Sequence, residues 1–166
     1  GDILPIEVNH FNGTGKFIIT GQLGDVMKES ASIALDYMKA NREKYGLQNI
    51  AFDKEDIHIH VPEGAVKKDG PSAGVSLTTA ILSAFSNRPV RDDVAMTGEI
   101  TLRGQVLPIG GLKEKSISAH RSGIRKIIIP KDNAKDIDDI PKSVQADLDI
   151  VLADHIDTVL EHALVK

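Results

Sequence analysis

Apolar and polar positions along this chain recur with two periods, 2 and 3.6, which are typical of half-buried strands and of amphipathic helices respectively. The clearest alternation covers residues 56–61. There Ile57, Ile59 and Val61 would face one way, and Asp56, His58 and His60 the other. We therefore expect a strand with one buried face and one polar face.

The longest helical pattern runs from Gly21 to Gly46. Its apolar stripe consists of Val26, Ile33, Ala34, Tyr37 and Met38, and we expect this stripe to lie in the core. Gly46 follows a polar stretch and is predicted to cap the C-terminus of the helix.

The rest of the chain alternates strands with helices. Strands are expected at residues 3–8, 17–20, 94–102, 106–109, 125–129 and 149–152, and helices at 72–87, 110–122 and 156–164, with a hairpin turn at 11–15. The acidic segment 132–141 predicts a short helix and loop. Its residues 132–139 would form either an oligomer contact or a solvated face, and we favour the solvated face. Because several strands come in pairs, we expect an α/β fold with a mixed sheet and packed helices rather than a doubly wound sheet.

Composition narrows the class of protein. The chain has 166 residues, 41% of them hydrophobic but only 4% aromatic, which suits one domain with an aliphatic core. It has no cysteine, so a disulfide framework and a thiol nucleophile are excluded. The net charge of -4 and the absence of a basic stripe argue against nucleic acid as a partner. No apolar run approaches the length of a membrane span, and we expect a cytoplasmic protein.

The segment 67–74, Lys-Lys-Asp-Gly-Pro-Ser-Ala-Gly, stands between a polar strand and a helical run. Gly70 and Pro71 turn the chain where the helix should begin, so Ser72 falls at or near its first turn. Serine is a common N-cap, which is one interpretation. The other is a nucleophile beside free backbone N–H groups that stabilise a developing anion.

A serine nucleophile needs a base to take its proton. His58, His60 and Asp69 are close in sequence, but no pairing follows from their spacing. The two histidines lack a third metal ligand at a persuasive spacing, so we expect no metal site.

Lys115 is a second candidate base. On a helix it shares a face with Leu112, Ser116 and Ala119, whereas Lys113 points elsewhere. A lysine directed into the protein holds its proton less tightly, because burial disfavours the charged form. The alternative is a lysine that extends from the helix edge into water.

Three segments, Lys68–Gly74, Thr97–Gly104 and Gly110–Lys115, occur in the order found in Lon proteases, and the chain resembles the proteolytic domain of these ATP-dependent enzymes. The likeness begins at Gly21–Ser30 and extends to the last helix, so it covers nearly the whole chain. It implies a fold of the Lon proteolytic-domain type. It also implies one proteolytic domain over residues 1–166, which we expect to be a C-terminal part of a larger protease.

The resemblance implies a role for each matching residue. Ser72 matches the nucleophile and Lys115 the general base of a Ser–Lys dyad. Thr97 matches a hydroxyl that bonds the lysine, and Asp69 an acidic residue that modulates the site. The remaining matches are His58, His60 and Glu99, which line the site, and Gly70, whose turn supplies backbone N–H groups to the oxyanion.

The implied activity is that of a serine endopeptidase that hydrolyses unfolded or damaged proteins. Members of this family form homohexameric rings, and an ATPase module delivers their substrates. The chain has no Walker A motif, so we expect no cofactor in this domain, and ATP and Mg²⁺ in the ATPase module. Two alternatives are a catalytically silent Lon-like scaffold and a small-molecule kinase or phosphate-binding protein that uses residues 70–74 as an anion cradle.

Overall fold

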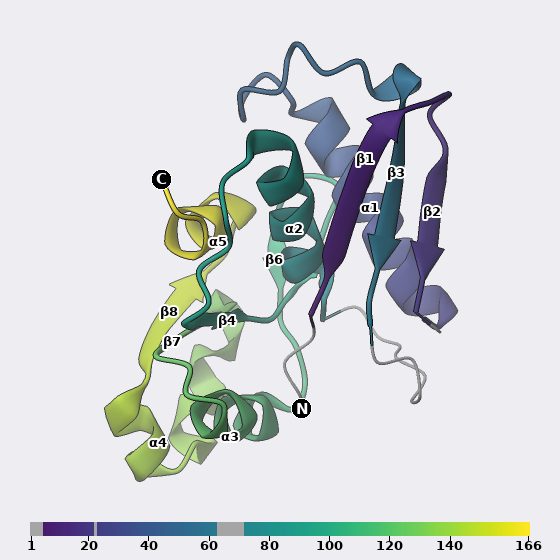
Figure 1. The fold of residues 1–166 in the computed structure, drawn as a ribbon. Helices are drawn as coiled ribbons and strands as arrows, with labels where there is room; N and C mark the ends of the chain where they lie inside the picture. Colours follow the sequence, from purple (N-terminus) through teal and green to yellow (C-terminus); the bar gives the residue numbers. More distant parts are fainter. Residues whose placement is uncertain (1–4, 22, 63–71) are drawn as a thin grey trace.

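The computed structural model describes residues 5–21, 23–62 and 72–166, in which strands alternate with helices (Figure 1). The strands are β1 (Glu7–Asn12), β2 (Phe17–Thr20), β3 (Glu55–His60), β4 (Val94–Met96), β5 (Glu99–Ile100), β6 (Val106–Leu107), β7 (Lys126–Pro130) and β8 (Asp149–Ala153). The α-helices are α1 (Asp25–Ala40), α2 (Gly74–Ser86), α3 (Leu112–Arg121), α4 (Lys142–Asp147) and α5 (Ile156–Ala163), and the 3₁₀ helices are η1 (Phe52–Lys54) and η2 (Lys131–Asp139). The predicted α/β class is confirmed, although the described strands form three small sheets.

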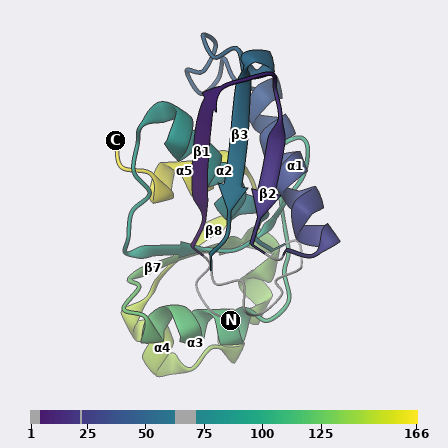
Figure 2. The same cartoon turned by 45° about the vertical axis from the view of Figure 1, so that its right-hand side comes forward.

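The first sheet has the strand order β1-β3-β2, with β1 antiparallel and β2 parallel to β3. Figure 2 shows α1 and α2 behind this sheet. Ile57 and Ile59 of β3 are buried, whereas His58 and His60 are half-buried. The alternation predicted for this strand is therefore confirmed, and its apolar side chains face the core.

The predicted hairpin turn at residues 11–15 is wrong. β1 continues to Asn12, and β3 lies between β1 and β2, so these two strands do not pair. The loop instead folds around Asp56 of β3, whose Oδ1 accepts hydrogen bonds from the N–H groups of Thr14 and Lys16, each at 2.9 Å. These bonds, that of Lys16 first, hold the pKa of Asp56 below its ordinary value.

Helix α1 is shorter than the sequence pattern predicted. Asn41 is its C-cap, so the prediction that Gly46 caps it is wrong. Val26 is 43% exposed, because the buried side chains follow the spacing of Met27, Ala31, Ala34 and Met38. Neither this helix of 16 residues nor another helix in the described ranges is long and apolar enough to cross a membrane.

The second sheet, with the order β4-β7-β8, is parallel and separates two clusters of buried side chains. Ile128 of β7 joins the first cluster, whereas Ile127 and Ile129 join the second, because alternate side chains of a strand point to opposite faces. The first cluster, here the large core, contains buried residues of α1, α2, α5 and β3. The second, here the small core, consists of Leu112, Ala119, Ile124, Ile127, Ile129, Ile140, Val144 and Leu148. It lies at the end of the molecule formed by α3 and α4 (Figure 1).

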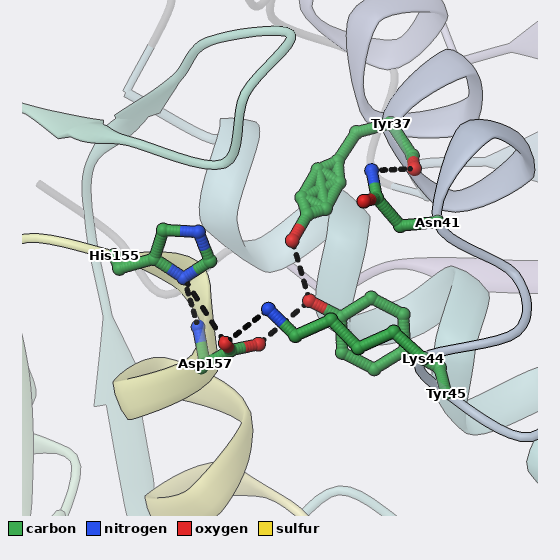
Figure 3. A network of polar contacts seen from close by, with 6 residues as sticks. All are labelled: Tyr37, Asn41, Lys44, Tyr45, His155 and Asp157. Carbon is green, nitrogen blue, oxygen red and sulfur yellow. Dashed lines mark hydrogen bonds and ion pairs between the residues drawn. The ribbon is translucent and has the colours of Figure 1, made fainter.

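A polar network ties α1 and the turn after it to α5 (Figure 3). Tyr45 donates a hydrogen bond to Asp157 at 2.6 Å and shares another with Tyr37 at 2.5 Å, and Lys44 forms an ion pair with Asp157. Burial acts to raise the pKa of Asp157, but the hydrogen bonds from Lys44 and Tyr45 outweigh it and lower that pKa. The network therefore favours an ionised Asp157 between two helices of the large core.

Candidate functional site

Ser72 and Lys115 are brought together from opposite sides of the second sheet. The Nζ of Lys115 donates a hydrogen bond to the Oγ of Ser72 at 3.2 Å. Both residues are half-buried. Ser72 lies two positions before α2, with Ala73 as the N-cap, so it stands near the helix N-terminus as the sequence predicted.

The backbone of Ser72 is held by Gly98. The N–H of Gly98 donates to the carbonyl oxygen of Ser72 at 2.8 Å, and the carbonyl of Gly98 accepts from the N–H of Val75 at 3.1 Å. This pairing interrupts the strand predicted over residues 94–102, which is instead two strands, β4 and β5, in different sheets. Pairing with the segment that carries Ser72 replaces continued pairing with β7, so the single-strand prediction is wrong.

Two glycines allow this close approach. A Cβ on Gly74 would lie 2.8 Å from the backbone nitrogen of Ile100, and one on Gly98 would lie 2.7 Å from Cγ1 of Val106. Both distances are shorter than side chains tolerate. The first turn of α2 and the β4–β5 junction can therefore touch only because these positions lack side chains.

Helix α3 directs Lys115 toward Ser72. It begins after Gly111, whose φ of +75° suits glycine, and the N–H of Lys115 donates to the carbonyl oxygen of Gly111 at 3.0 Å. Leu112, Ser116 and Ala119 are buried on one face of this helix, and Lys113 is exposed. The predicted difference in orientation between Lys113 and Lys115 is therefore present.

Thr97 and Glu99 flank Gly98. Thr97 is buried, and its N–H donates to the carbonyl oxygen of Ile128 at 3.1 Å, which fixes it to β7. In the described part of the chain, no hydrogen bond joins Thr97 to Lys115. Glu99 is half-buried at the start of β5, where it pairs with Leu107 of β6. Both residues thus lie on the segment that holds Ser72.

His58 and His60 lie on the outer face of the first sheet with Thr20. Nε2 of His58 is 2.8 Å and Nδ1 of His60 is 2.6 Å from the Oγ1 of Thr20, so the threonine hydroxyl joins the two rings. Thr20 was not among the predicted site residues, although the parallel register that places it opposite His60 explains the contact. Within the described ranges, no hydrogen bond links these three side chains to Ser72 or Lys115.

The remaining predicted site residues, Asp69 and Gly70, lie outside the described residues. Among the residues that are described, no three His, Asp or Glu side chains gather in a way that could hold a metal ion. The acidic η2 is largely exposed, with Asn133 as its buried member.

The chain is similar to known proteases along its whole length. A family model, that of the Lon protease (S16) C-terminal proteolytic domain, matches residues 1–166. The Lon protease of Bacillus thuringiensis (strain Al Hakam) is 61% identical over 165 residues, which cover 99% of this chain and 21% of that protein. The Lon protease of Mycoplasma mycoides subsp. mycoides SC is 63% identical over 161 residues, and Lon protease 1 of Bacillus subtilis (strain 168) is 60% identical over 165 residues.

This chain therefore spans about a fifth of the length of the relatives it matches, at 20% or 21% of each of these three proteins. The matched part is the proteolytic domain, and the family is one of serine peptidases. The chain belongs to the Lon protease family, of which it is a C-terminal proteolytic domain.

Proposed function

We propose that this chain hydrolyses peptide bonds with a Ser–Lys dyad, in which Ser72 is the nucleophile and Lys115 the general base. The observation that carries the proposal is the 3.2 Å separation of Lys115 Nζ and Ser72 Oγ. An uncharged amine at this distance can accept the hydroxyl proton directly, since it is within reach of a hydrogen bond. The burial of Leu112, Ser116 and Ala119 on α3 supports a fixed position for Lys115.

In the acylation step, Ser72 Oγ attacks the carbonyl carbon of the peptide and Lys115 takes the hydroxyl proton. The tetrahedral intermediate then collapses, the C–N bond breaks, and Lys115 returns the proton to the leaving amine. In the second step a water molecule loses a proton to Lys115 and attacks the ester carbonyl. The ester bond breaks and Ser72 regains its proton, so the peptide is hydrolysed and both residues are restored.

The negative charge of the intermediate needs nearby donors. Ser72 lies beside the N-terminus of α2, a helix of 13 residues whose first N–H groups carry partial positive charge. We assign the oxyanion to this end of α2 and, as the resemblance implies, to the backbone N–H groups of Gly70 and Ser72. Thr97, Asp69, Glu99, His58 and His60 are proposed to orient or line the site, as the resemblance implies.

The substrates are proposed to be unfolded or damaged polypeptides. A separate ATPase module would use ATP and Mg²⁺ to deliver them, within a homohexameric ring. No step of the peptide chemistry described above passes through ATP or Mg²⁺. The chemistry of this domain can therefore be tested with a short peptide that needs no unfolding.

The test is cleavage of a fluorogenic peptide by the chain and its variants. Ser72→Ala is expected to lower kcat/KM at least about a thousandfold, because the covalent step is lost. Ser76→Ala is the matched control, since Ser76 is also a half-buried serine and lies in the first turn of α2, close to Ser72 in the sequence. Cleavage by Ser72→Ala at the rate of Ser76→Ala would overturn the proposal.

A further inference from the structure

Asn133 is a buried polar residue in a segment that is otherwise largely exposed. Asn133 is 1% exposed, whereas Asp132, Asp138 and Asp139 of the same 3₁₀ helix η2 are exposed. Burying an amide is costly unless its hydrogen bonds are satisfied. Asn133 is therefore placed here by specific partners.

Those partners are the backbone of Ile109 and the carboxylate of Asp136. The N–H of Ile109 donates to Asn133 Oδ1 at 2.9 Å, and Asn133 Nδ2 donates to the carbonyl oxygen of Ile109 at 2.9 Å. Nδ2 also donates to Asp136 Oδ2 at 2.8 Å. One side-chain amide thus pairs with both backbone groups of a residue 24 positions away, as a neighbouring strand would.

Ile109 lies just before α3, the helix that carries Lys115. It is followed by Gly110 and Gly111, which are exposed and have no side chains to pack, and Gly111 is the N-cap of α3. The cap residue makes no side-chain hydrogen bond to the helix. The start of α3 is therefore fixed by Asn133 on one side of the two glycines and by the buried Leu112 on the other.

We propose that Asn133 is a positioning residue for the lysine of the dyad. It holds Ile109, Ile109 sets where α3 begins, and the start of α3 sets the separation of Lys115 Nζ from Ser72 Oγ. This inference rests on the proposed function. A displacement of about 1 Å at a reacting group lowers rates by as much as about a hundredfold, so the loss of this anchor has a measurable kinetic effect.

The test measures how fast a fluorophosphonate labels Ser72 in the 166-residue chain, by mass spectrometry. In this reaction Ser72 Oγ bonds to phosphorus, the P–F bond breaks, fluoride leaves, and Lys115 takes the hydroxyl proton. Asn133→Ala is expected to slow labelling about 10- to 100-fold at a temperature where circular dichroism shows every variant folded. The matched control is Asn41→Ala, which removes an amide hydrogen bond of 2.9 Å to the Tyr37 carbonyl beside the large core and should label at the unaltered rate.

A double-mutant cycle separates positioning from general structural damage. If Asn133 acts through Lys115, then Asn133→Ala slows labelling in the native background but not in Lys115→Ala. An equal slowing in both backgrounds would overturn the inference, as would labelling of folded Asn133→Ala at the native rate. If Ser72 of the unaltered chain is not labelled while a control serine protease reacts fully, the proposed function itself fails.

A second pair of variants serves if Asn133→Ala does not fold. Asn133→Asp keeps an acceptor for the Ile109 N–H but removes the donor and places two carboxylates together. Adding Asp136→Asn supplies a side-chain amide at position 136 that can donate a hydrogen bond to the carboxylate at position 133. We expect Asn133→Asp to label slowly and the double variant to recover part of the rate. Labelling of folded Asn133→Asp at the native rate would contradict the inference, because this variant has no donor for the carbonyl oxygen of Ile109.

Discussion

The two residues of the proposed dyad come from regions that are packed differently. Ser72 precedes α2, whose buried face belongs to the large core together with α1, α5 and β3. Lys115 is on α3, which rests on the small core, where eight buried side chains cluster among the described residues. The nucleophile is thus attached to the more extensively buried region, whereas the position of the base depends on fewer apolar contacts.

The polar contacts of the two regions also differ in what they add to the packing. The large core has an added network around Asp157, which joins two helices that apolar contacts already hold (Figure 3). Beside the small core, Asn133 fixes the backbone of Ile109, which is followed by two glycines that have no side chains to pack. We therefore expect a polar contact to matter most for the site where apolar contacts are fewest.

The largest expected effect comes from equal truncations in the two cores. Ile129 and Ile156 are both fully buried, in the small and large core respectively. Each Ile→Ala change is expected to lower the free energy of unfolding by about 2–5 kcal/mol, measured by urea denaturation. Only Ile129→Ala should also slow Ser72 labelling in the folded protein. Equal labelling rates in the two variants would show that the small core does not control the site more than the large core does.

A smaller effect is expected where α2 touches β5. Gly74→Ala places a Cβ 2.8 Å from both Cγ2 and the backbone nitrogen of Ile100, so α2 must shift. We expect a loss of about 1–3 kcal/mol in the free energy of unfolding, together with slower labelling of Ser72. Gly110→Ala is the control for stability, because among the described residues no atom beyond those of its two chain neighbours lies within 4 Å of the added Cβ. Equal stability of the two variants would show that the contact is not tight.

The smallest effect is expected for Asp157→Asn. Asp157 is 44% exposed, so water screens its ion pair with Lys44, and we expect a loss of about 1 kcal/mol with labelling unchanged. The pKa of this carboxylate is lowered in the folded state, so its contribution is present above the ordinary value of 3.8 and is lost as the pH falls below it. The difference between native and variant should therefore shrink in urea titrations as the pH falls below the lowered pKa of Asp157. A difference that persists there would contradict this assignment.

The sequence was sufficient where local pattern decides structure. Alternation predicted β3, the Gly110–Gly111 turn predicted the start of α3, and helical spacing predicted that Lys115 and not Lys113 points inward. Each of these depends on neighbours within one element. The three motifs shared with the Lon family assigned Ser72 and Lys115 to one site, which local pattern alone does not do.

Contacts distant in sequence could not be predicted in this way. The hairpin was wrong because β3, which follows α1, pairs with both β1 and β2. The prediction of one strand over residues 94–102 was wrong because Gly98 pairs with Ser72 and Val75. A glycine in the sequence does not reveal whether a strand continues or ends there. Asn133 was missed because an asparagine in an acidic, exposed segment gives no sign of its partner Ile109.

We propose that Lys115 acts on Ser72 as a base and not only as a nearby charge. Lys115→Arg tests it most directly, because arginine keeps the positive charge but does not give up its proton in proteins. The measurement is the rate at which a fluorophosphonate labels Ser72, with Lys113→Arg on the exposed face of α3 as the matched control. We predict that Lys115→Arg labels at least about a hundredfold more slowly and that Lys113→Arg labels at the native rate. Labelling of Lys115→Arg at the native rate would contradict the dyad.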